Sequence, residues 1–402
     1  MTETLLRDER QGNRNESTRQ HNLSVVLSYV HEKGPITRAE LTRQTNLNRS
    51  TIGALVAELE QLGLVYETAP PLEQRSVGRP SPLVHPSNDI VALGVNPDFD
   101  AVQVSVVGFG GVVHDVARRL TPGPPTPQES IDILAELVSE LQATRGRRVV
   151  GVGLAIPGLV NEYTQTVKLA PNLGWEDVEY SAMVEAALGY PTRAANDANL
   201  GVIAEYMFGA GRGCDNVVYL NGSTSGIGGG VVSDSRLIRG SRSFGAELGH
   251  TLVNSNGIRC GCGRTGCLET EVSIRRMWKV VGEEVAITEL DAYYADNDFG
   301  EVAEELDRQA RALALGIANI VTIFSPERVI LGGHVGALFD ARRVLVENEV
   351  TRLALPVHGQ GIAIVRNELR ARMMAIGAAE LAFSEVLRDP AGTLSALGLT
   401  QA

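Results

Sequence analysis

The stretch that decides the fold is Cys260-Gly261-Cys262-Gly263-Arg264-Thr265-Gly266-Cys267, and His250 lies ten residues before it. Three thiols and one imidazole at this spacing can reach a single tetrahedral ion, and Cys and His are ligands that zinc prefers. Four protein ligands close the coordination sphere, so the spacing predicts a structural Zn²⁺ held by His250, Cys260, Cys262 and Cys267. The glycines at 261, 263 and 266 indicate a backbone that needs positive φ and close approach to wrap an ion within eight residues.

A free-thiol or disulfide-bonded loop is the alternative for this stretch. The fourth cysteine, Cys214, lies far upstream, and the two thiols of a Cys-x-Cys pair rarely bond to each other. Zinc is therefore favoured. Four cysteines, three of them committed to a metal, are also typical of a reducing compartment.

The composition is that of a globular protein of the cytoplasm. With 402 residues, 44% of them hydrophobic, the chain is long enough for two or three domains that each bury a core. No apolar run approaches the ~20 residues of a membrane span. The first residues, MTETLLRDERQGNRNESTRQ, are too polar for a signal peptide. We therefore expect a cytoplasmic protein with no membrane segment.

The charge is divided unevenly along the chain. The net charge is −12, but residues 1–85 hold ten Lys and Arg against ten Asp and Glu and are neutral. All of the excess negative charge lies downstream, which argues against nucleic-acid binding by the whole surface. A neutral N-terminal segment still allows a local basic patch there.

Three helices with apolar faces are predicted in the N-terminal segment. The first helix stops at Gly34-Pro35, and Thr37 with Glu40 forms a capping box that begins the second. Asn48 can cap the third helix. The apolar positions that repeat at helical spacing in the first and third helices are Leu23, Val26, Leu27, Val30, Ile52, Leu55, Val56, Leu59 and Leu62.

The third helix has the features of a DNA recognition helix. Arg49, Ser50 and Thr51 stand at its start, where a helix in the major groove touches bases and phosphates. A short strand and a loop rich in proline and arginine follow, and this loop carries Arg75 and Gly78-Arg79-Pro80. An arginine on a stiff extended backbone suits a narrow minor groove. The pattern predicts a winged helix-turn-helix, with a small dimerisation module and linker as the alternative.

Downstream of residue 86, strand patterns alternate with helix patterns, which predicts an α/β fold. Residues 90–107 alternate as a strand, the glycines at 108–111 turn the chain into a second strand over 112–118, and a helix over 129–142 precedes the buried strand 149–156. A glycine-rich hairpin starts a second such unit near 217, and the apolar helix 310–324 leads into a strand over 329–331. Two α/β halves with a cleft between them resemble the actin-like sugar-kinase architecture.

Four strings in this region are distinctive: Asn196-Asp197-Ala198-Asn199, Gly245-Ala246-Glu247-Leu248-Gly249-His250, CGCGRTGCLE at 260–269 and LGG at 331–333. Together they resemble the ROK family, which contains bacterial sugar kinases and sugar-responsive repressors. The resemblance spans residues 90–385 or so. Kinases of the family usually begin directly at the first phosphate strand, so the N-terminal head looks like the repressor branch.

The resemblance also implies a sugar site. Family residues that bind sugar hydroxyls correspond here to Asn172, Asn196, Asp197, Glu247, His250 and Glu269. Their chemistry suits the task, because a carboxylate accepts pairs of hydroxyl hydrogen bonds and a buried polar group rejects an analogue that lacks the matching hydroxyl.

The phosphate-binding part of the family pattern is altered. The kinases have Asp-x-Gly-Gly-Thr after their first strand, whereas this chain has Asn96-Pro97-Asp98. Proline removes an amide donor and Asp98 places negative charge where phosphate would lie. The second glycine loop, 224–230, and Gly332-Gly333 are kept. Without the first cradle, phosphoryl transfer loses electrostatic stabilisation on which it depends.

Together these patterns predict a sugar-responsive DNA-binding regulator, most simply a repressor, that is not an enzyme. Its expected partners are operator DNA, a sugar or sugar phosphate, and further copies of itself in a homodimer or homotetramer. The alternative is an ATP-dependent sugar kinase with an accessory head, in which Asp197 is the catalytic base. The predicted domains are the head at 1–85 and a ROK domain at 86–402, with a smaller lobe at 86–200 plus 372–402 and a larger lobe at 201–371 that carries the zinc loop at 250–267.

Overall fold

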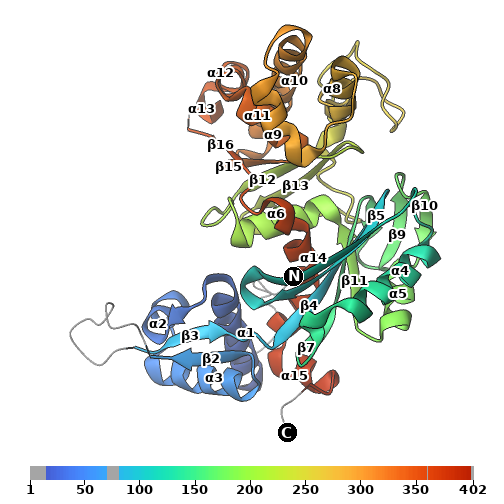
Figure 1. Ribbon diagram of the computed structural model, residues 1–402. Helices are drawn as coiled ribbons and strands as arrows, with labels where there is room; N and C mark the ends of the chain where they lie inside the picture. Colours follow the sequence, from blue (N-terminus) through green and yellow to red (C-terminus); the bar gives the residue numbers. More distant parts are fainter. Residues whose placement is uncertain (1–14, 70–80, 360, 400–402) are drawn as a thin grey trace. The chain divides into compact units, whose positions relative to one another are not determined.

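The computed structural model describes residues 15–69, 81–359 and 361–399, which form two compact units (Figure 1). The first unit consists of residues up to Gly158, Thr164–Ala195 and Met374 onward, and the second consists of Leu159–Tyr163 and Asn196–Met373. In the described part of the chain, no helix has the length and apolar character needed to cross a membrane. The domain boundaries expected from the sequence stay a prediction.

The N-terminal segment folds as a winged helix, which we call the head (described residues 15–69 and 81–86). Thr37 accepts the backbone N–H of Glu40, and Asn48 accepts that of Thr51, so both predicted helix starts are confirmed. The short strands pair in the order β1-β3-β2. The elements are α1 (Asn15–Lys33), β1 (Ile36–Thr37), α2 (Arg38–Thr45), α3 (Arg49–Gln61), β2 (Val65–Thr68) and β3 (Leu83–Pro86).

The rest of the first unit is built on a five-stranded mixed sheet with the order β11-β7-β4-β5-β6. Strands β4 and β7 run parallel and are buried almost throughout, as their unbroken apolar sequences predict. The elements are β4 (Ile90–Asp98), β5 (Ala101–Gly108), β6 (Val112–Leu120), α4 (Pro127–Glu140), β7 (Arg148–Ile156), β9 (Thr166–Ala170), β10 (Trp175–Val178), α5 (Tyr180–Leu188), β11 (Thr192–Asn196), α14 (Met373–Arg388) and α15 (Pro390–Ala396), with short 3-10 turns at Phe109–Gly111 (η2) and Gln142–Thr144.

One predicted strand is wrong in this unit. Residues 90–107 form two strands, because Phe99 and Asp100 make a two-residue turn in which Asp98 pairs with Ala101. The Asp98 carboxylate accepts the backbone N–H of Phe99 and stabilises the turn. The two turn residues, Phe99 and Asp100, are neither the glycine nor the asparagine that usually marks such a turn.

The second unit repeats the strand order of the first. Its five-stranded sheet runs β14-β13-β12-β15-β16, again an antiparallel meander joined to parallel strands. The elements are β8 (Leu159–Asn161), α6 (Asp197–Phe208), β12 (Val217–Gly222), β13 (Ile227–Ser233), β14 (Arg236–Leu237), η4 (Leu248–His250), α7 (Leu268–Glu271), α8 (Ile274–Val281), α9 (Leu290–Asp296), α10 (Gly300–Phe324), β15 (Arg328–Gly332), α11 (Gly333–Ala341), α12 (Arg343–Leu353), α13 (Pro356–Gly359) and β16 (Ala363–Arg366), with 3-10 turns at Ile287–Glu289 and Arg370–Arg372.

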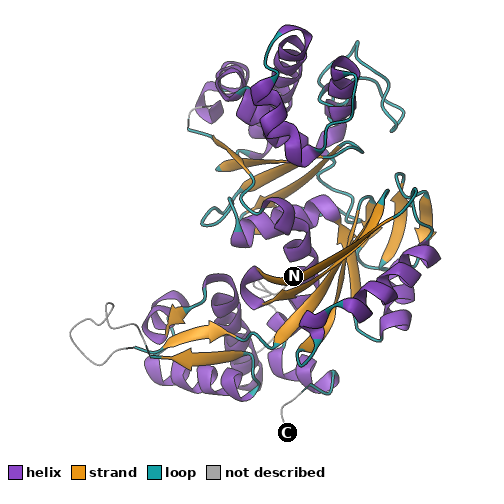
Figure 2. Cartoon of the chain, viewed as in Figure 1, coloured by secondary structure: helices purple, strands orange, loops and turns teal. Residues whose placement is uncertain are grey.

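Helices cover both faces of this second sheet (Figure 2). Val218 and Leu220 of β12 belong to the apolar core made with α10 and α11. Tyr219 points the other way and packs on Gly201 of α6, where a Cβ would come within 2.8 Å of the ring. The alternation of side chains along β12 therefore places α6 on the face opposite α10 and α11.

In the first unit, α14 lies so close to β7 that its position depends on glycine. A Cβ on Gly153 would lie 1.8 Å from the carbonyl oxygen of Ala378. We expect Gly153→Ala to lower the free energy of unfolding by about 3 kcal/mol, because helix and strand must separate. Gly123→Ala is the matched control, since its Cβ would meet no atom within 4 Å. Urea unfolding of both variants measures the difference, and equal midpoints would contradict the expectation.

Candidate functional site

Glycines of β13 allow two segments that carry predicted site residues to pack closely against this strand. A Cβ on Gly228 would meet Ala198 of α6 at 2.9 Å, and a Cβ on Gly229 would meet Leu248 of η4 at 2.8 Å. Because neighbouring residues of a strand face opposite sides, α6 and η4 approach β13 from its two faces. The starts of α6 and η4 therefore lie against the same strand.

The Asn196-Asp197 pair forms the start of α6. Asn196 is the N-cap, and its side-chain oxygen accepts the backbone N–H of Asn199. Asp197 is the first helical residue, and its carboxylate accepts the backbone N–H of Ala198. The helix dipole favours negative charge at this position. Asn196 thus has a structural use, and Asp197 is a carboxylate fixed at a helix start.

Glu247 and Glu269 lie close to His250. Burial raises the pKa of Glu247, while the nearby His250 lowers it and Glu269 raises it. Glu269 has one carboxylate oxygen 3.4 Å from Nδ1 of His250. Its other oxygen lies 2.4 Å from where a Cβ on Gly226 would stand, so Glu269 reaches the β12–β13 hairpin. The structure therefore brings Glu247, His250 and Glu269 together.

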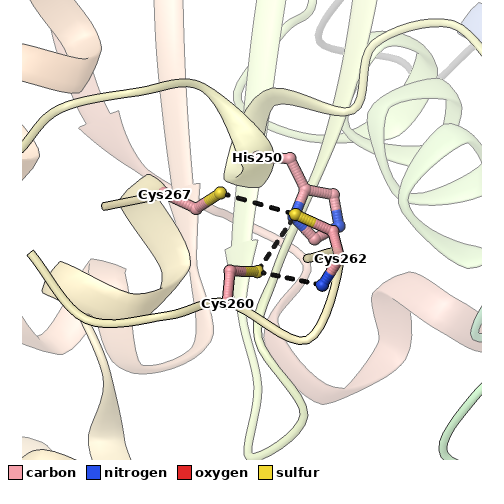
Figure 3. Close-up of side chains that lie close together, drawn as sticks. All are labelled: His250, Cys260, Cys262 and Cys267. Atoms are coloured by element: carbon pink, nitrogen blue, oxygen red, sulfur yellow. Dashed lines mark hydrogen bonds between the residues drawn. The ribbon is translucent and has the colours of Figure 1, made fainter. Parts of the chain in front are cut away.

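The four predicted metal ligands converge (Figure 3). One ligand atom from each of His250, Cys260, Cys262 and Cys267 lies within 4.8 Å of all the others. Cys262 Sγ is 3.7 Å from Cys267 Sγ, and Cys260 Sγ is 3.6 Å from Nδ1 of His250. Tetrahedral ligands at zinc bond lengths stand about 3.5–3.8 Å apart. The cluster can therefore hold a metal ion.

A small backbone loop presents the thiols. Arg259 pairs with Thr265, and the N–H of Cys260 donates to the carbonyl of Arg264 at 2.7 Å. Gly263 and Gly266 have positive φ, as the sequence predicts, and a Cβ on Gly266 would overlap the carbonyl of Asn254. The expectation for Gly261 is wrong, because its φ is ordinary and a Cβ there would meet nothing within 4 Å.

Hydrogen bonds from Arg264 stabilise the thiolate form of one of the four candidate ligands, Cys262. They lower the pKa of Cys262 to about 6, so that at neutral pH its thiolate form is favoured. The thiolate is the form that binds metal ions. Burial raises the pKa of Cys260, whose thiol donates to Glu269 at 2.9 Å. A metal ion bound by Cys260 would displace that proton.

Glu271 supports the loop, a role that no pattern in the sequence predicts. This buried carboxylate accepts the backbone N–H of Ile258 and pairs with Arg308 of α10. It therefore fastens the metal loop to the core of the second unit. The residue stands two positions after Glu269 on the short helix α7, and no periodicity or motif of the sequence distinguishes it.

The remaining predicted residues lie in the first unit or outside the described residues. Asn172 is half-buried in the turn between β9 and β10. Arg49 and Ser50 are exposed at the start of α3, and Thr51 is half-buried behind the Asn48 cap. Arg75, Gly78, Arg79 and Pro80 fall within 70–80 and lie outside the described residues.

The altered phosphate segment forms the closed end of the β4–β5 hairpin. Pro97 pairs with Val102 within the sheet, and the amide of Phe99 is engaged by Asp98. Burial raises the pKa of Asp98. The second glycine loop is a hairpin turn in which the N–H of Ser223 donates to the carbonyl of Gly226 at 2.9 Å.

Sequence comparison identifies the class. The model of the ROK family matches residues 95–385, so the chain belongs to this family. The model of the MarR family matches residues 24–76, which contain α2, α3 and β2 of the head. The predicted family, the α/β ROK fold and the winged helix-turn-helix are thereby confirmed.

Similar proteins match both parts of the chain. A putative xylose repressor of Caldicellulosiruptor sp. (strain Rt8B.4) is 27% identical over 92% of this chain and 98% of its own. The xylose repressor of Bacillus subtilis (strain 168) is 30% identical over 77% of this chain and 81% of its own. The crystal structure of a ROK family transcriptional regulator, a homologue of the E. coli MLC protein, has a TM-score of 0.78 at 24% identity and covers 96% of this chain and 100% of its own. That structure supports the same fold through the head and the ROK region.

Proposed function

We propose that this chain is a sugar-responsive transcriptional repressor of the cytoplasm. The observation that carries the proposal is the match to xylose repressors over 92% of the chain, with a winged-helix head before the ROK region. Operator DNA and a monosaccharide are its ligands, and D-xylose is the first sugar to test. A phosphorylated sugar is the second.

The sugar site rests on the carboxylates of the second unit. Asp197, Glu247 and Glu269 can each accept hydrogen bonds from sugar hydroxyls, and His250 stands beside two of them. The family resemblance adds Asn172 and Asn196 as further ligands. A site of this chemistry selects sugars by the positions of their hydroxyls, because a missing hydroxyl leaves a buried acceptor unpaired.

We propose structural Zn²⁺ for the cluster of His250, Cys260, Cys262 and Cys267. Three thiols and one imidazole favour zinc over harder ions, and a closed set of four protein ligands fits a structural role. Zinc in this loop would fix Glu269, which contacts both Cys260 and His250. A metal would thus set the geometry of the sugar site without touching the sugar.

DNA recognition is assigned to the head and requires more than one copy of the chain. Arg49 and Ser50 at the exposed start of α3 suit the major groove. Arg75 and Gly78-Arg79-Pro80, which lie outside the described residues, have the chemistry that suits the minor groove. Half-sites about one or more helical turns apart call for a homodimer or homotetramer. Sugar changes operator affinity through the spacing of paired heads, and linkage makes the effect reciprocal.

The kinase alternative has one specific observation in its favour, the glycine hairpin that resembles a phosphate loop next to Asp197. The closed β4–β5 turn opposes it, because Asp98 already engages the amide of Phe99. A coupled assay of ADP release across a panel of hexoses and pentoses separates the two functions. Sugar-dependent ADP release would establish the kinase.

Operator binding tests the repressor directly. DNA duplexes selected from a random library should shift with the parent protein, and D-xylose should change the affinity at least tenfold. Arg49→Ala should weaken operator binding by about 1–3 kcal/mol and leave sugar affinity unchanged, because Arg49 belongs to the head alone. A mobility-shift titration with and without the sugar measures both. Selection that enriches no sequence would refute DNA recognition.

A further inference from the structure

A buried polar contact joins the head to the rest of the first unit. His31 near the end of α1 and Glu380 in α14 are both fully buried. Nε2 of His31 lies 3.0 and 2.9 Å from the two oxygens of the Glu380 carboxylate. A buried carboxylate is costly unless it is well paired, so this contact strongly constrains where α1 can lie relative to α14.

The other side of the His31 ring is also fixed. Nδ1 accepts the backbone N–H of Gly110 at 3.1 Å, so Nε2 carries the hydrogen and donates it to Glu380. The rings of Phe109 and Phe383 stand edge-on to the imidazole, at 5.1 and 5.6 Å between centroids. His31 therefore fixes the head against both the tip of the β5–β6 hairpin and α14.

A second contact holds the recognition helix. Arg148, the first residue of β7, donates to the carbonyls of Leu62 and Gly63 just after α3, at 2.9 and 2.7 Å. The same guanidinium donates to the carbonyl of Leu399 at 3.0 Å. Guanidinium has five donors in a rigid fork, so three carbonyls on one arginine define its orientation well. The end of α3 is therefore fastened to the sheet of the first unit.

Helix α14, which carries Glu380, is covalently continuous with the second unit. It begins at Met373, the last residue of the second unit, and continues through the first. Along the way it packs against Gly94 of β4 and Gly153 of β7 at distances that leave no room for a side chain. A rigid helix so closely packed moves as a body with few alternative positions.

We infer that the His31–Glu380 contact, supported by Arg148, is the path by which sugar binding sets the position of the DNA-binding head. The inference rests on the proposed function. A sugar bound by the carboxylates of the second unit stabilises one conformation of that unit. That conformation sets the position of the start of α14 at Met373. A shift of α14 moves Glu380 and with it His31 of α1, while Arg148 keeps the end of α3 on the sheet of the first unit. His31, Glu380 and Arg148 are positioning residues that touch neither DNA nor sugar.

Variants at both ends of the contact test this path. His31→Asn keeps an acceptor for the Gly110 N–H but is too short to reach Glu380, and Glu380→Ala removes the acceptor. Glu380→Gln keeps an oxygen for Nε2–H and serves as the conservative variant. Glu385→Gln is the matched control, because Glu385 lies on the same helix and pairs at the surface with Arg193 of β11.

The readout is the ratio of operator affinities with and without saturating D-xylose, together with D-xylose affinity alone. We expect the ratio to fall at least fivefold in His31→Asn and Glu380→Ala, with D-xylose affinity within about twofold of the parent. Glu380→Gln and Glu385→Gln should keep ratios within about twofold of the parent. Arg148→Ala should lower the ratio in the same direction.

Each outcome decides the inference. Folded His31→Asn and Glu380→Ala proteins with the parental ratio would overturn it and leave the proposed function standing. Parallel loss of sugar affinity and operator affinity would also overturn it, because it would show a merely structural role. A parent protein whose operator affinity does not respond to D-xylose, D-glucose or their phosphates would overturn the proposed function and the inference together.

Discussion

Cys262→Ser should yield a protein that contains no stoichiometric zinc and no longer responds to sugar. The Cys262 thiol lies 3.7 Å from that of Cys267, and its pKa of about 6 makes it the thiolate most ready to bind a metal. A serine hydroxyl is a poor replacement for a thiolate as a zinc ligand. Structural zinc sites contribute on the order of 10 kcal/mol in small domains, so loss of the ion should disorder the loop.

The sugar response should fail because the loop and the carboxylates share contacts. Glu269 lies against Cys260 and His250, and Glu247 lies three residues before His250. We expect sugar affinity to fall at least a hundredfold, while operator binding by the head persists without sugar control. Metal analysis and calorimetry with D-xylose on the same sample measure both effects.

Cys214→Ser is the matched control for this experiment. Cys214 is also a cysteine of the second unit but does not belong to the ligand cluster. The control should keep one zinc per chain and parental sugar affinity. A zinc-free Cys262→Ser protein that still binds D-xylose like the parent would show that metal and sugar site are uncoupled.

Local signals in the sequence predicted the parts of the structure that depend on neighbouring residues. Thr37 and Asn48 begin their helices as expected, since a cap involves only three or four residues. The metal loop was predictable for the same reason. Its thiols lie within eight residues, and His250 ten residues upstream is brought back by backbone pairing of Leu252 with Cys267.

Contacts between distant residues left no such signal. His31 and Glu380 are 349 positions apart, and neither stands in a motif. His31 appears in the sequence as one more polar residue at the end of an amphipathic helix. The turn at Phe99 and Asp100 was missed for a different reason, because its stabilising bond comes from Asp98 instead of from a glycine-dependent backbone conformation. Gly261 is the opposite case: it stands in a glycine-rich motif, but neither its φ nor its surroundings require a glycine.

Asp197→Ala should remove most of the sugar affinity without removing the metal. The carboxylate stands at the first position of α6 and is oriented by the backbone N–H of Ala198. A hydrogen bond to a charged group contributes about 1.5–3 kcal/mol, and one carboxylate can accept from two hydroxyls. Loss of both bonds should therefore weaken D-xylose binding roughly a hundredfold, or about 2.7 kcal/mol.

Measurements of stability and zinc content distinguish a direct loss of sugar binding in Asp197→Ala from damage to the fold. Asn196 and not Asp197 caps α6, so the substitution leaves the cap in place. Loss of the carboxylate's favourable interaction with the helix dipole costs about 0.5 kcal/mol, and its bond to the N–H of Ala198 is lost as well. Asp197→Asn keeps an oxygen acceptor of the same shape and should lose about tenfold in affinity, between the parent and Asp197→Ala. Zinc should remain at one per chain in both variants, because Asp197 is not among the cluster ligands. Calorimetry that finds parental D-xylose affinity in Asp197→Ala would exclude this carboxylate from the sugar site and leave the binding to Glu247 and Glu269.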